Sequence, residues 1–548
     1  MPPQDAPQPS RTAHTMSEAE SSKVGFGSAV PQAPASPGRL WTGRVLGPVL
    51  GVLAYFALPA HEQLTIEGRT AAAIAIVMAV WWMTEAIPLA ATALLPIVAF
   101  PLLDVVPIAD ATAPYASPTI FLFMGGFMIA LAMQKWGLHK RIALHTVRIV
   151  GTHPKQIVLG MMIATAFLSM WVSNTATTLM MLPIAISVLA LVTSGTDPGE
   201  EKNVRNFAVC LMLAIAYAAS VGGLATIIGS PPNAIMVGFV DENYGITISF
   251  AEWMRIGVPI AVVFLIIVWL LLTYVIYPTK IKQIMGGKEM IHDRIHELGP
   301  MSRGEWNVLV VFVVTALLWV FRDLLADFDA LTTVLPFMAN LSDAGIAIAA
   351  AVVLFLLPAR DTRTPENSAA DSATADGGDD RRKFHHGTLD WHTVQSGLPW
   401  GVLILFGGGL SLAGAVQDTG LDEYIGTQVG GLGALPIVFL VAGTCAIVLL
   451  LTELTSNTAT AATFLPVLGG VALGLGMDPM LLLLPAVLAA SCAFMLPVAT
   501  PPNAIVFGSG QVTIGQMIRA GIWLNIVGVM LITVAVFALG SWAMGISF

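Results

Sequence analysis

Long apolar runs, separated by short polar stretches, dominate the sequence. Most runs are about 17 to 25 residues long, which is the length that an α-helix needs to cross the hydrocarbon core of a bilayer. Uninterrupted runs lie at 44–60, 118–135, 254–277, 306–321, 344–358, 399–416 and 520–545, and residues 69–103 contain further apolar spans. This pattern predicts an all-α polytopic membrane protein.

Four other apolar segments are interrupted by polar or helix-breaking residues. The interruptions are Ser173-Asn174-Thr175 within 156–193, Gly229-Ser230-Pro231-Pro232-Asn233 within 206–240, Ser456-Asn457-Thr458 within 434–473 and Ala499-Thr500-Pro501-Pro502-Asn503 within 479–510. Proline has no N–H group and stops a helix, so two prolines in succession predict unwound backbone. Polar groups are costly to bury in lipid, so each interruption is a candidate functional site.

The interruptions form an internal repeat. Ser173 and Ser456 are 283 positions apart, whereas Pro231 and Pro501 are 270 positions apart. The 13-residue difference fits a longer loop at 194–206 in the first half. Recurrence in the same order and at matched spacing favours a duplicated functional unit over isolated packing motifs.

The distribution of Lys and Arg predicts an orientation in the membrane. These residues are frequent in 135–155, 280–303 and 359–383, whereas 104–117 and 417–434 contain none. Basic loops favour the cytoplasmic side. With both Ser-Asn-Thr segments as re-entrant hairpins, the chain has about 11 membrane-spanning helices, a cytoplasmic N-terminus, an extracytoplasmic C-terminus and two inverted halves. If each hairpin were instead a pair of full membrane spans, the chain would cross the membrane and return, so each loop would keep the side assigned above. The polar tips favour re-entrant hairpins.

This reading divides the chain into consecutive units. They are a disordered cytoplasmic tail (1–43), a first transmembrane helix (44–66), repeat 1 (67–278) with re-entrant hairpin 156–193 and broken helix 206–240, a cytoplasmic linker (279–305), and repeat 2 (306–548) with cytoplasmic loop 359–395, re-entrant hairpin 434–473 and broken helix 479–510. We expect a multi-pass protein of the cell (inner) membrane.

Composition excludes several classes of function. Hydrophobic residues make up 56% of the chain and charged residues 11%, against about 25% charged in soluble domains. The formal net charge of −9 resides in loops and tails, and nothing indicates nucleic-acid binding. The three cysteines have no metal-like spacing. Neither a nucleophile–base pair nor a set of metal ligands is evident in the apolar segments, so we do not expect an enzyme.

The interrupted segments favour a secondary transporter. Inverted repeats with broken helices place substrate and coupling ions near the bilayer midplane. Helix N-termini at the breaks attract an anion, while unwound carbonyls and Ser, Thr and Asn oxygens suit sodium. Glu453 is the only ionisable residue close to either Ser-Asn-Thr motif. An anion site without Lys or Arg draws its compensating charge from bound cations, which favours sodium coupling over a proton role for Glu453.

Together with Trp81-Trp82-Met83-Thr84-Glu85-Ala86-Ile87-Pro88, these motifs resemble the divalent anion:sodium symporter family, which includes sodium-coupled dicarboxylate and citrate carriers. The resemblance spans residues 45–545. It implies a homodimer in the lipid bilayer, in which each protomer has a scaffold domain and an elevator-type transport domain.

The resemblance also implies ligands. The substrate carboxylates would meet Asn174, Thr175, Asn457 and Thr458, with Ser230, Thr500 and Pro501 of the Pro-Pro loops nearby. Sodium site 1 would comprise Ser169, Ser173, Asn174 and the backbone of Gly229, and sodium site 2 would comprise Thr452, Thr455, Asn457 and the backbone of Ala499.

We therefore expect sodium-coupled uptake of C4-dicarboxylates such as succinate, malate or fumarate by an elevator mechanism. A sodium-independent dicarboxylate exchanger of the same fold is the main alternative, and citrate or sulfate are alternative substrates. An anion channel is less favoured, because a channel has no need of paired cation sites.

Overall fold

A computed structural model describes residues 37–59, 64–151, 153–194, 200–279, 281, 287–359 and 387–548. The regular structure of these residues is helical, apart from isolated β-bridge residues; one such bridge joins Pro358 and Gly387 in antiparallel fashion. Nine of the described helices are long and apolar enough to cross a membrane. The predicted all-α membrane class is therefore confirmed, whereas about 11 spans stays a prediction, because shorter apolar helices add to these nine.

The helices of the first half run from α2 to α14. They are α2 (Pro37–Ala57), α3 (Ile66–Thr84), α4 (Leu89–Thr92), α5 (Leu95–Leu102), α6 (Ile108–Thr112), η1 (Ala113–Ala116), α7 (Pro118–Lys135), α8 (Leu138–Val150), α9 (Pro154–Ser169), α10 (Asn174–Ser194), α11 (Glu201–Gly223), α12 (Pro231–Tyr244), α13 (Phe250–Leu270), the π-helical η2 (Leu271–Ile276) and α14 (Gly287–Glu297).

The helices of the second half run from α15 to α26. They are α15 (Arg303–Ala326), α16 (Asp329–Val334), η3 (Pro336–Asn340), α17 (Asp343–Leu356), α19 (Trp391–Gly397), α20 (Trp400–Asp418), α21 (Leu421–Gln428), η5 (Gly430–Ala434), α22 (Ile437–Thr452), α23 (Asn457–Gly474), α24 (Met480–Ala490), α25 (Pro501–Gly508) and α26 (Ile514–Met544).

The first helix begins earlier than the sequence predicts. Helix α2 starts at Pro37, so residues 37–43 are helical and not part of a disordered tail, and α2 ends at Ala57, before residue 66. Proline suits the first turn of a helix, where its missing N–H group has no intrahelical partner to lose. The rest of the predicted tail, most of loop 359–395 and part of linker 279–305 lie outside the described residues.

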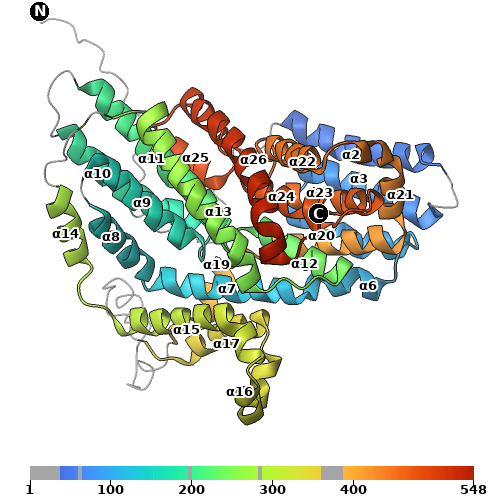
Figure 1. The fold of residues 1–548 in the computed structure, drawn as a ribbon, viewed down its shortest axis with the longest axis horizontal. Helices are drawn as coiled ribbons and strands as arrows, with labels where there is room; N and C mark the ends of the chain where they lie inside the picture. Colours follow the sequence, from blue (N-terminus) through green and yellow to red (C-terminus); the bar gives the residue numbers. More distant parts are fainter. Residues whose placement is uncertain are drawn as a thin grey trace, which may run out of the picture.

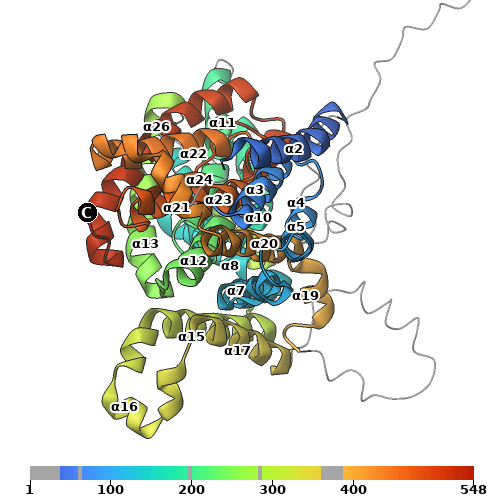
Figure 2. The same cartoon turned by 90° about the vertical axis from the view of Figure 1, so that its right-hand side faces the viewer.

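The interrupted segments form two helix–turn–helix hairpins and two broken helices. Hairpin α9–α10 lies beside broken helix α11–α12, and hairpin α22–α23 lies beside broken helix α24–α25. Figure 1 shows the first hairpin and α11 towards one end of the molecule, with α22, α23 and α24 towards the other. Helices α15, α16 and α17 form a separate layer (Figure 2), which contacts the remainder mainly through α7, and also through α13, α8 and the first hairpin.

Close packing of α11 against α9 depends on a glycine. A Cβ atom at Gly222 would lie 2.3 Å from the carbonyl oxygen of Ala166 in α9. Because that neighbour is backbone, it cannot rotate away, and a side chain would push the two helices apart. Helices α9 and α11 can therefore pack this closely because Gly222 has no side chain.

We predict that Gly222→Ala destabilises the protein by about 1–3 kcal/mol, because the added methyl group overpacks the α9–α11 contact. Thermal unfolding of the purified protein, followed by tryptophan fluorescence, should show a lower apparent transition temperature.

The matched control is Gly414→Ala in α20, where an added Cβ meets no atom within 4 Å. This variant should keep or raise the transition temperature, because alanine favours a helix over glycine. Equal transition temperatures for both variants would contradict the packing argument.

Candidate binding site

The first Ser-Asn-Thr motif forms the turn of hairpin α9–α10. Ser169 is the last residue of α9, and Asn174 and Thr175 are the first two residues of α10. Ser173 caps α10, because its Oγ accepts a hydrogen bond from the N–H group of Ala176 at 3.2 Å. The turn is half-buried, so its polar groups remain accessible to a small ligand.

Several oxygen atoms converge behind this turn. The hydroxyl of Ser169 lies 2.7 Å from the carbonyl oxygen of Ala219 and also contacts Oδ1 of Asn174. The Asn174 side-chain amide lies against the same groups and the carbonyl of Gly229; with its NH2 group turned towards them it donates to Ser169 Oγ, to Ala219 O at 3.1 Å and to Gly229 O at 3.3 Å. Gly223 leaves room for the group, since a Cβ there would lie 2.9 Å from Asn174 Oδ1. We call the Ser169 hydroxyl and the carbonyls of Ala219 and Gly229, which surround the Asn174 amide, the first oxygen cluster; hard cations prefer oxygen ligands.

The second hairpin carries the same arrangement. Thr452 ends α22 and Asn457 begins α23, and the Thr452 hydroxyl lies 2.7 Å from Asn457 Oδ1 and 2.8 Å from the carbonyl of Ala490. These three oxygens form the second oxygen cluster. Thr452 and Asn457 stand 283 positions after Ser169 and Asn174, which have the same contacts in the first cluster. The two halves therefore repeat the geometry as well as the motif.

Two residues proposed for the second sodium site have other hydrogen-bond partners. The Thr455 hydroxyl donates to the carbonyl of Leu451 at 2.9 Å and contacts the Thr460 hydroxyl at 2.7 Å. Ala499 donates its N–H group to the carbonyl of Leu496 at 3.2 Å. No described hydrogen bond joins either residue to Thr452. A cation role for them thus rests on carbonyl oxygens and not on side chains.

The unwound backbone of the first broken helix is held by an asparagine that sequence reasoning did not assign. Residues 224–230 separate α11 from α12. Nδ2 of Asn233 donates to the carbonyl of Gly223 at 2.9 Å and to that of Thr226 at 2.8 Å. Asn233 is fully buried, so these bonds satisfy carbonyls that have no access to water.

The second broken helix repeats this arrangement across residues 491–500. Nδ2 of Asn503 donates to the carbonyls of Ala493 and Leu496, each at 3.1 Å. All three residues lie 270 positions after their counterparts in the first half. The sequence does carry a signal for this role, because an asparagine directly follows each of the two Pro-Pro pairs.

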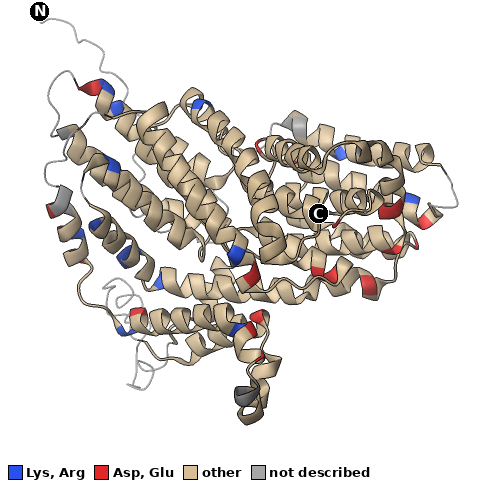
Figure 3. Ribbon diagram, viewed as in Figure 1, with Lys and Arg blue, Asp and Glu red and all other residues tan. Residues whose placement is uncertain are grey.

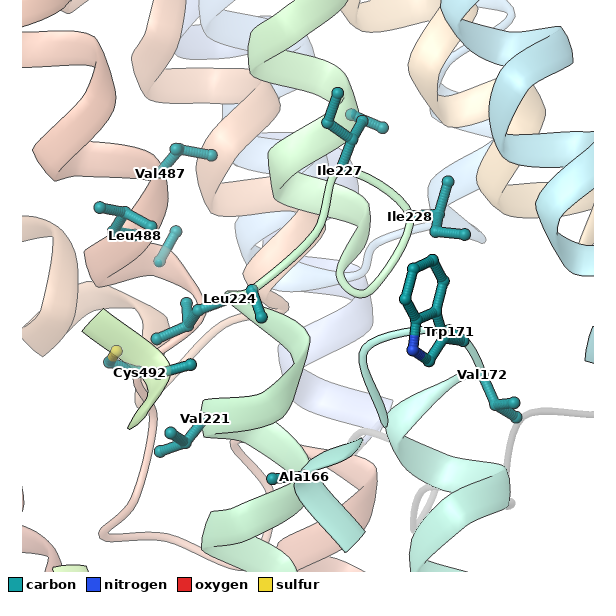
Figure 4. Close-up of a cluster of buried hydrophobic side chains, with 14 of the residues drawn as sticks. Ala166, Trp171, Val172, Val221, Leu224, Ile227, Ile228, Val487, Leu488 and Cys492 are labelled. Atoms are coloured by element: carbon teal, nitrogen blue, oxygen red, sulfur yellow. The ribbon is translucent and has the colours of Figure 1, made fainter. Parts of the chain in front are cut away.

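The two breaks and the two hairpin tips lie together. Ser230 at the start of α12 contacts Ser491 at the end of α24, with the two hydroxyls 3.0 Å apart. Helix α10 packs against α25, and α23 packs against α12, so each hairpin touches the broken helix of the other half. Thr500 caps α25 through the N–H group of Asn503, and Pro501 is the first residue of that helix. Figure 4 shows the apolar surroundings, with Ile227 and Ile228 from one half and Val487 and Leu488 from the other.

An aromatic stack next to the first tip also escaped sequence reasoning. The Trp171 ring stacks on Trp319 and Phe250, with ring centroids 6.4 and 5.9 Å apart, and meets Phe312 edge-on at 5.0 Å. Trp171 thereby links the tip to α13 and α15. A single tryptophan beside a polar motif gave no signal for these partners, because they are distant in sequence.

A family model described as sodium:sulfate symporter transmembrane region matches residues 39–546. The chain belongs to this family. The sequence-based prediction of a membrane transport protein and not an enzyme is therefore confirmed.

Relatives of known name cover nearly the whole chain. The sodium-dependent dicarboxylate transporter SdcS of Staphylococcus aureus is 40% identical over 526 residues, which is 95% of each chain. The protein of the same name from Staphylococcus saprophyticus is 40% identical over 507 residues, which is 92% of each chain.

Two solved transporter structures share the fold at low sequence identity. The Alcanivorax borkumensis YdaH transporter has a TM-score of 0.51 at 14% identity and covers 86% of this chain and 99% of its own. Neisseria gonorrhoeae MtrF, described as one of a class of antimetabolite efflux pumps, has a TM-score of 0.54 at 12% identity and covers 92% of this chain and 95% of its own.

We predict that Asn503→Ala lowers the stability of this family member by about 1–3 kcal/mol, since two carbonyl groups lose their side-chain donor away from water. The apparent unfolding temperature of the purified protein should fall.

Asn243→Ala is the matched control. Its Nδ2 donates to the carbonyl of Phe239, four residues earlier in α12, and that carbonyl keeps its helical N–H partner. This variant should unfold close to the wild-type temperature. A larger effect at Asn243 than at Asn503 would contradict the proposed role of the Pro-Pro-Asn asparagine.

Proposed function

We propose that the protein couples sodium to the uptake of C4-dicarboxylates such as succinate, malate or fumarate across the cell (inner) membrane. The observation that carries this proposal is the pair of oxygen clusters, which occur at equivalent positions of the two hairpins. The names of the relatives, sodium-dependent dicarboxylate transporters at 40% identity, support the choice of both ion and substrate.

Sodium binding accounts for the polarity of the clusters. Each cluster brings a hydroxyl and a main-chain carbonyl oxygen together beside the asparagine of the tip, and oxygen ligands of these kinds suit a hard cation such as sodium. In this proposal, one sodium ion binds Ser169, Ser173, Asn174 and the carbonyl of Gly229. A second sodium ion binds Thr452, Thr455, Asn457 and the carbonyl of Ala499.

The substrate then binds between the two tips. Helices α10 and α23 each begin at the asparagine of a Ser-Asn-Thr motif, so both direct free N–H groups and a positive dipole end towards the site. The hydroxyls of Thr175 and Thr458 make no hydrogen bond within the described residues and are available to a ligand. We propose that each carboxylate meets the Asn and Thr of one tip, with Ser230, Thr500 and Pro501 nearby.

Bound sodium supplies the positive charge that this anion site needs. Residues 156–193, 206–240, 434–473 and 479–510 contain no Lys or Arg. Two carboxylates in such a site are stabilised only by N–H groups, hydroxyls and ions. Loading of sodium should therefore precede or accompany loading of the dicarboxylate.

The distribution of charge supports an orientation. Figure 3 shows Lys and Arg gathered around α8, α14 and the first turns of α11, whereas Asp and Glu predominate near α6 and α21 at the opposite end. Under the positive-inside rule we propose that the basic end faces the cytoplasm, with the N-terminus inside and the C-terminus outside. A homodimer and an elevator movement of the hairpins are carried over from the family resemblance.

The decisive test is uptake of labelled succinate into proteoliposomes, with and without an inward sodium gradient and with and without internal dicarboxylate. We expect sodium-dependent uptake into empty vesicles. Uptake that requires internal dicarboxylate and ignores sodium would replace symport by exchange.

Removing either tip asparagine should abolish uptake, because Asn174→Ala and Asn457→Ala each delete a ligand shared by sodium and substrate. Initial rates should fall at least about 100-fold, as is usual when binding geometry is lost.

Asn340→Ala, at the exposed end of η3, is the matched control and should transport at the wild-type rate. Elution of all three variants at the wild-type position in gel filtration would establish that they fold. Normal transport by both tip variants would remove the tips from the site.

A further inference from the structure

We propose that Glu453 is a positioning residue for the second sodium site, and that the first sodium site has no equivalent group. This inference rests on the proposed function above. It makes the two sodium sites unequal, although they occupy equivalent places in the repeat.

Glu453 holds the unwound segment 491–500 through three consecutive backbone N–H groups. Its Oε1 accepts from Phe494 at 2.7 Å and from Met495 at 3.0 Å. Its Oε2 accepts from Met495 at 3.1 Å and from Leu496 at 3.2 Å. Only 1% of Glu453 is exposed, so these N–H groups replace water as the partners of the carboxylate.

A fourth donor comes from another helix. Nδ2 of Asn525 in α26 donates to Oε1 of Glu453 at 2.8 Å. The side chain thus joins the end of α22, the unwound segment and α26. Every described hydrogen-bond partner of the Glu453 carboxyl group is a donor. This set of partners matches an ionised carboxylate, because both of its oxygens accept hydrogen bonds and neither donates.

The first half has apolar residues at the corresponding positions. Hairpin position 453 corresponds to Met170, by the offset of 283 that relates the two tips. Position 525 corresponds to Ala261, by the offset of 264 that relates α13 to α26.

Two independent features establish the offset of 264. Ser249 and Thr513 both cap their helices with a capping box. Gly257 and Gly521 both abut the unwound backbone, since a Cβ would lie 2.6 Å from Leu224 O in one half and 2.6 Å from backbone atoms of Met495 in the other.

In the first half, the unwound segment 224–230 is held by weaker hydrogen bonds. The hydroxyl of Thr226 donates to the main-chain carbonyl of Met170. Nε1 of Trp253 in α13 donates to the carbonyl of Leu224 at 3.0 Å. Both hydrogen bonds are neutral, whereas the second half has several bonds to a charged acceptor, and charge-assisted bonds are about twice as strong. The difference between the halves is therefore in the anchoring of the segment and not in the oxygen cluster.

Few residues separate Glu453 from the proposed ligands of the second sodium site. Glu453 follows Thr452 directly in sequence. The carbonyl of Leu496, whose own N–H group is held by Glu453, accepts from Ala499 at 3.2 Å and from Asn503 at 3.1 Å. Glu453 thus fixes the backbone that presents the carbonyl of Ala499. Its negative charge also attracts a cation bound at this site.

The test is the sodium dependence of succinate uptake in proteoliposomes for Glu453→Gln. The carboxamide keeps the shape of the side chain but turns an NH2 group towards a backbone N–H. We expect the half-saturating sodium concentration to rise about tenfold, equivalent to ~1.4 kcal/mol, while the maximal rate at saturating sodium changes by less than about threefold.

Further variants separate positioning from a purely structural role. Asn525→Ala removes one donor and should raise the half-saturating sodium concentration by a smaller factor. The double variant should be no worse than Glu453→Gln alone, because both changes act on one interaction. Met170→Leu is the control at the equivalent position and should leave the sodium dependence unchanged.

Sodium-induced thermal stabilisation gives a second measure of binding that does not need transport. Glu453→Gln should require about tenfold more sodium for the same shift in unfolding temperature. If Glu453→Gln does not fold, the weakened sodium response of Asn525→Ala carries the test.

The outcomes distinguish this inference from the proposed function. A wild-type protein that transports without sodium would overturn both. Sodium-dependent wild-type uptake together with unchanged sodium dependence in Glu453→Gln and Asn525→Ala would overturn only the role of Glu453. A sodium shift as large in Met170→Leu as in Glu453→Gln would also overturn it, because the two sites would then respond alike.

Discussion

Backbone that leaves the helical conformation inside a membrane has to find new hydrogen-bond partners. Lipid offers none, and each unpaired N–H or C=O group costs several kcal/mol, about the size of a whole domain's margin of stability. In this protein the carbonyls of both breaks meet the amide of an asparagine, Asn233 or Asn503. The N–H groups of the second break meet Glu453. These side chains are what permits unwound peptide at the centre of the fold.

Satisfying the breaks from within leaves other groups available to a ligand. The asparagines after Pro-Pro and Glu453 are directed at backbone, so they are already occupied. The hydroxyls of Thr175 and Thr458 are not, and they lie at the first turns of two helices. The proposed site therefore separates into groups that hydrogen-bond to the backbone and groups that have no such partner among the described residues, although both kinds lie within a few residues of each other in sequence.

Much of this arrangement could be predicted from sequence, and the reasons are physical. Spans follow from length and hydropathy, breaks from proline, and the repeat from constant offsets. What could not be predicted depends on distant partners. The contact of Ser230 with Ser491 joins residues 261 positions apart, and the rings around Trp171 come from α13 and α15. The early start of α2 at Pro37 escaped detection because the tail composition continues into the helix.

The crosswise packing of the halves has a consequence for biosynthesis. Helix α10 packs against α25, and α12 packs against α23. The first hairpin therefore enters the membrane without its final neighbour, which follows about 300 residues later, and at ~5–20 residues per second the delay is some tens of seconds. Throughout that interval the polar turn at Ser173-Asn174-Thr175 is incompletely packed. The first hairpin therefore reaches its final packing only after α25 has been synthesised.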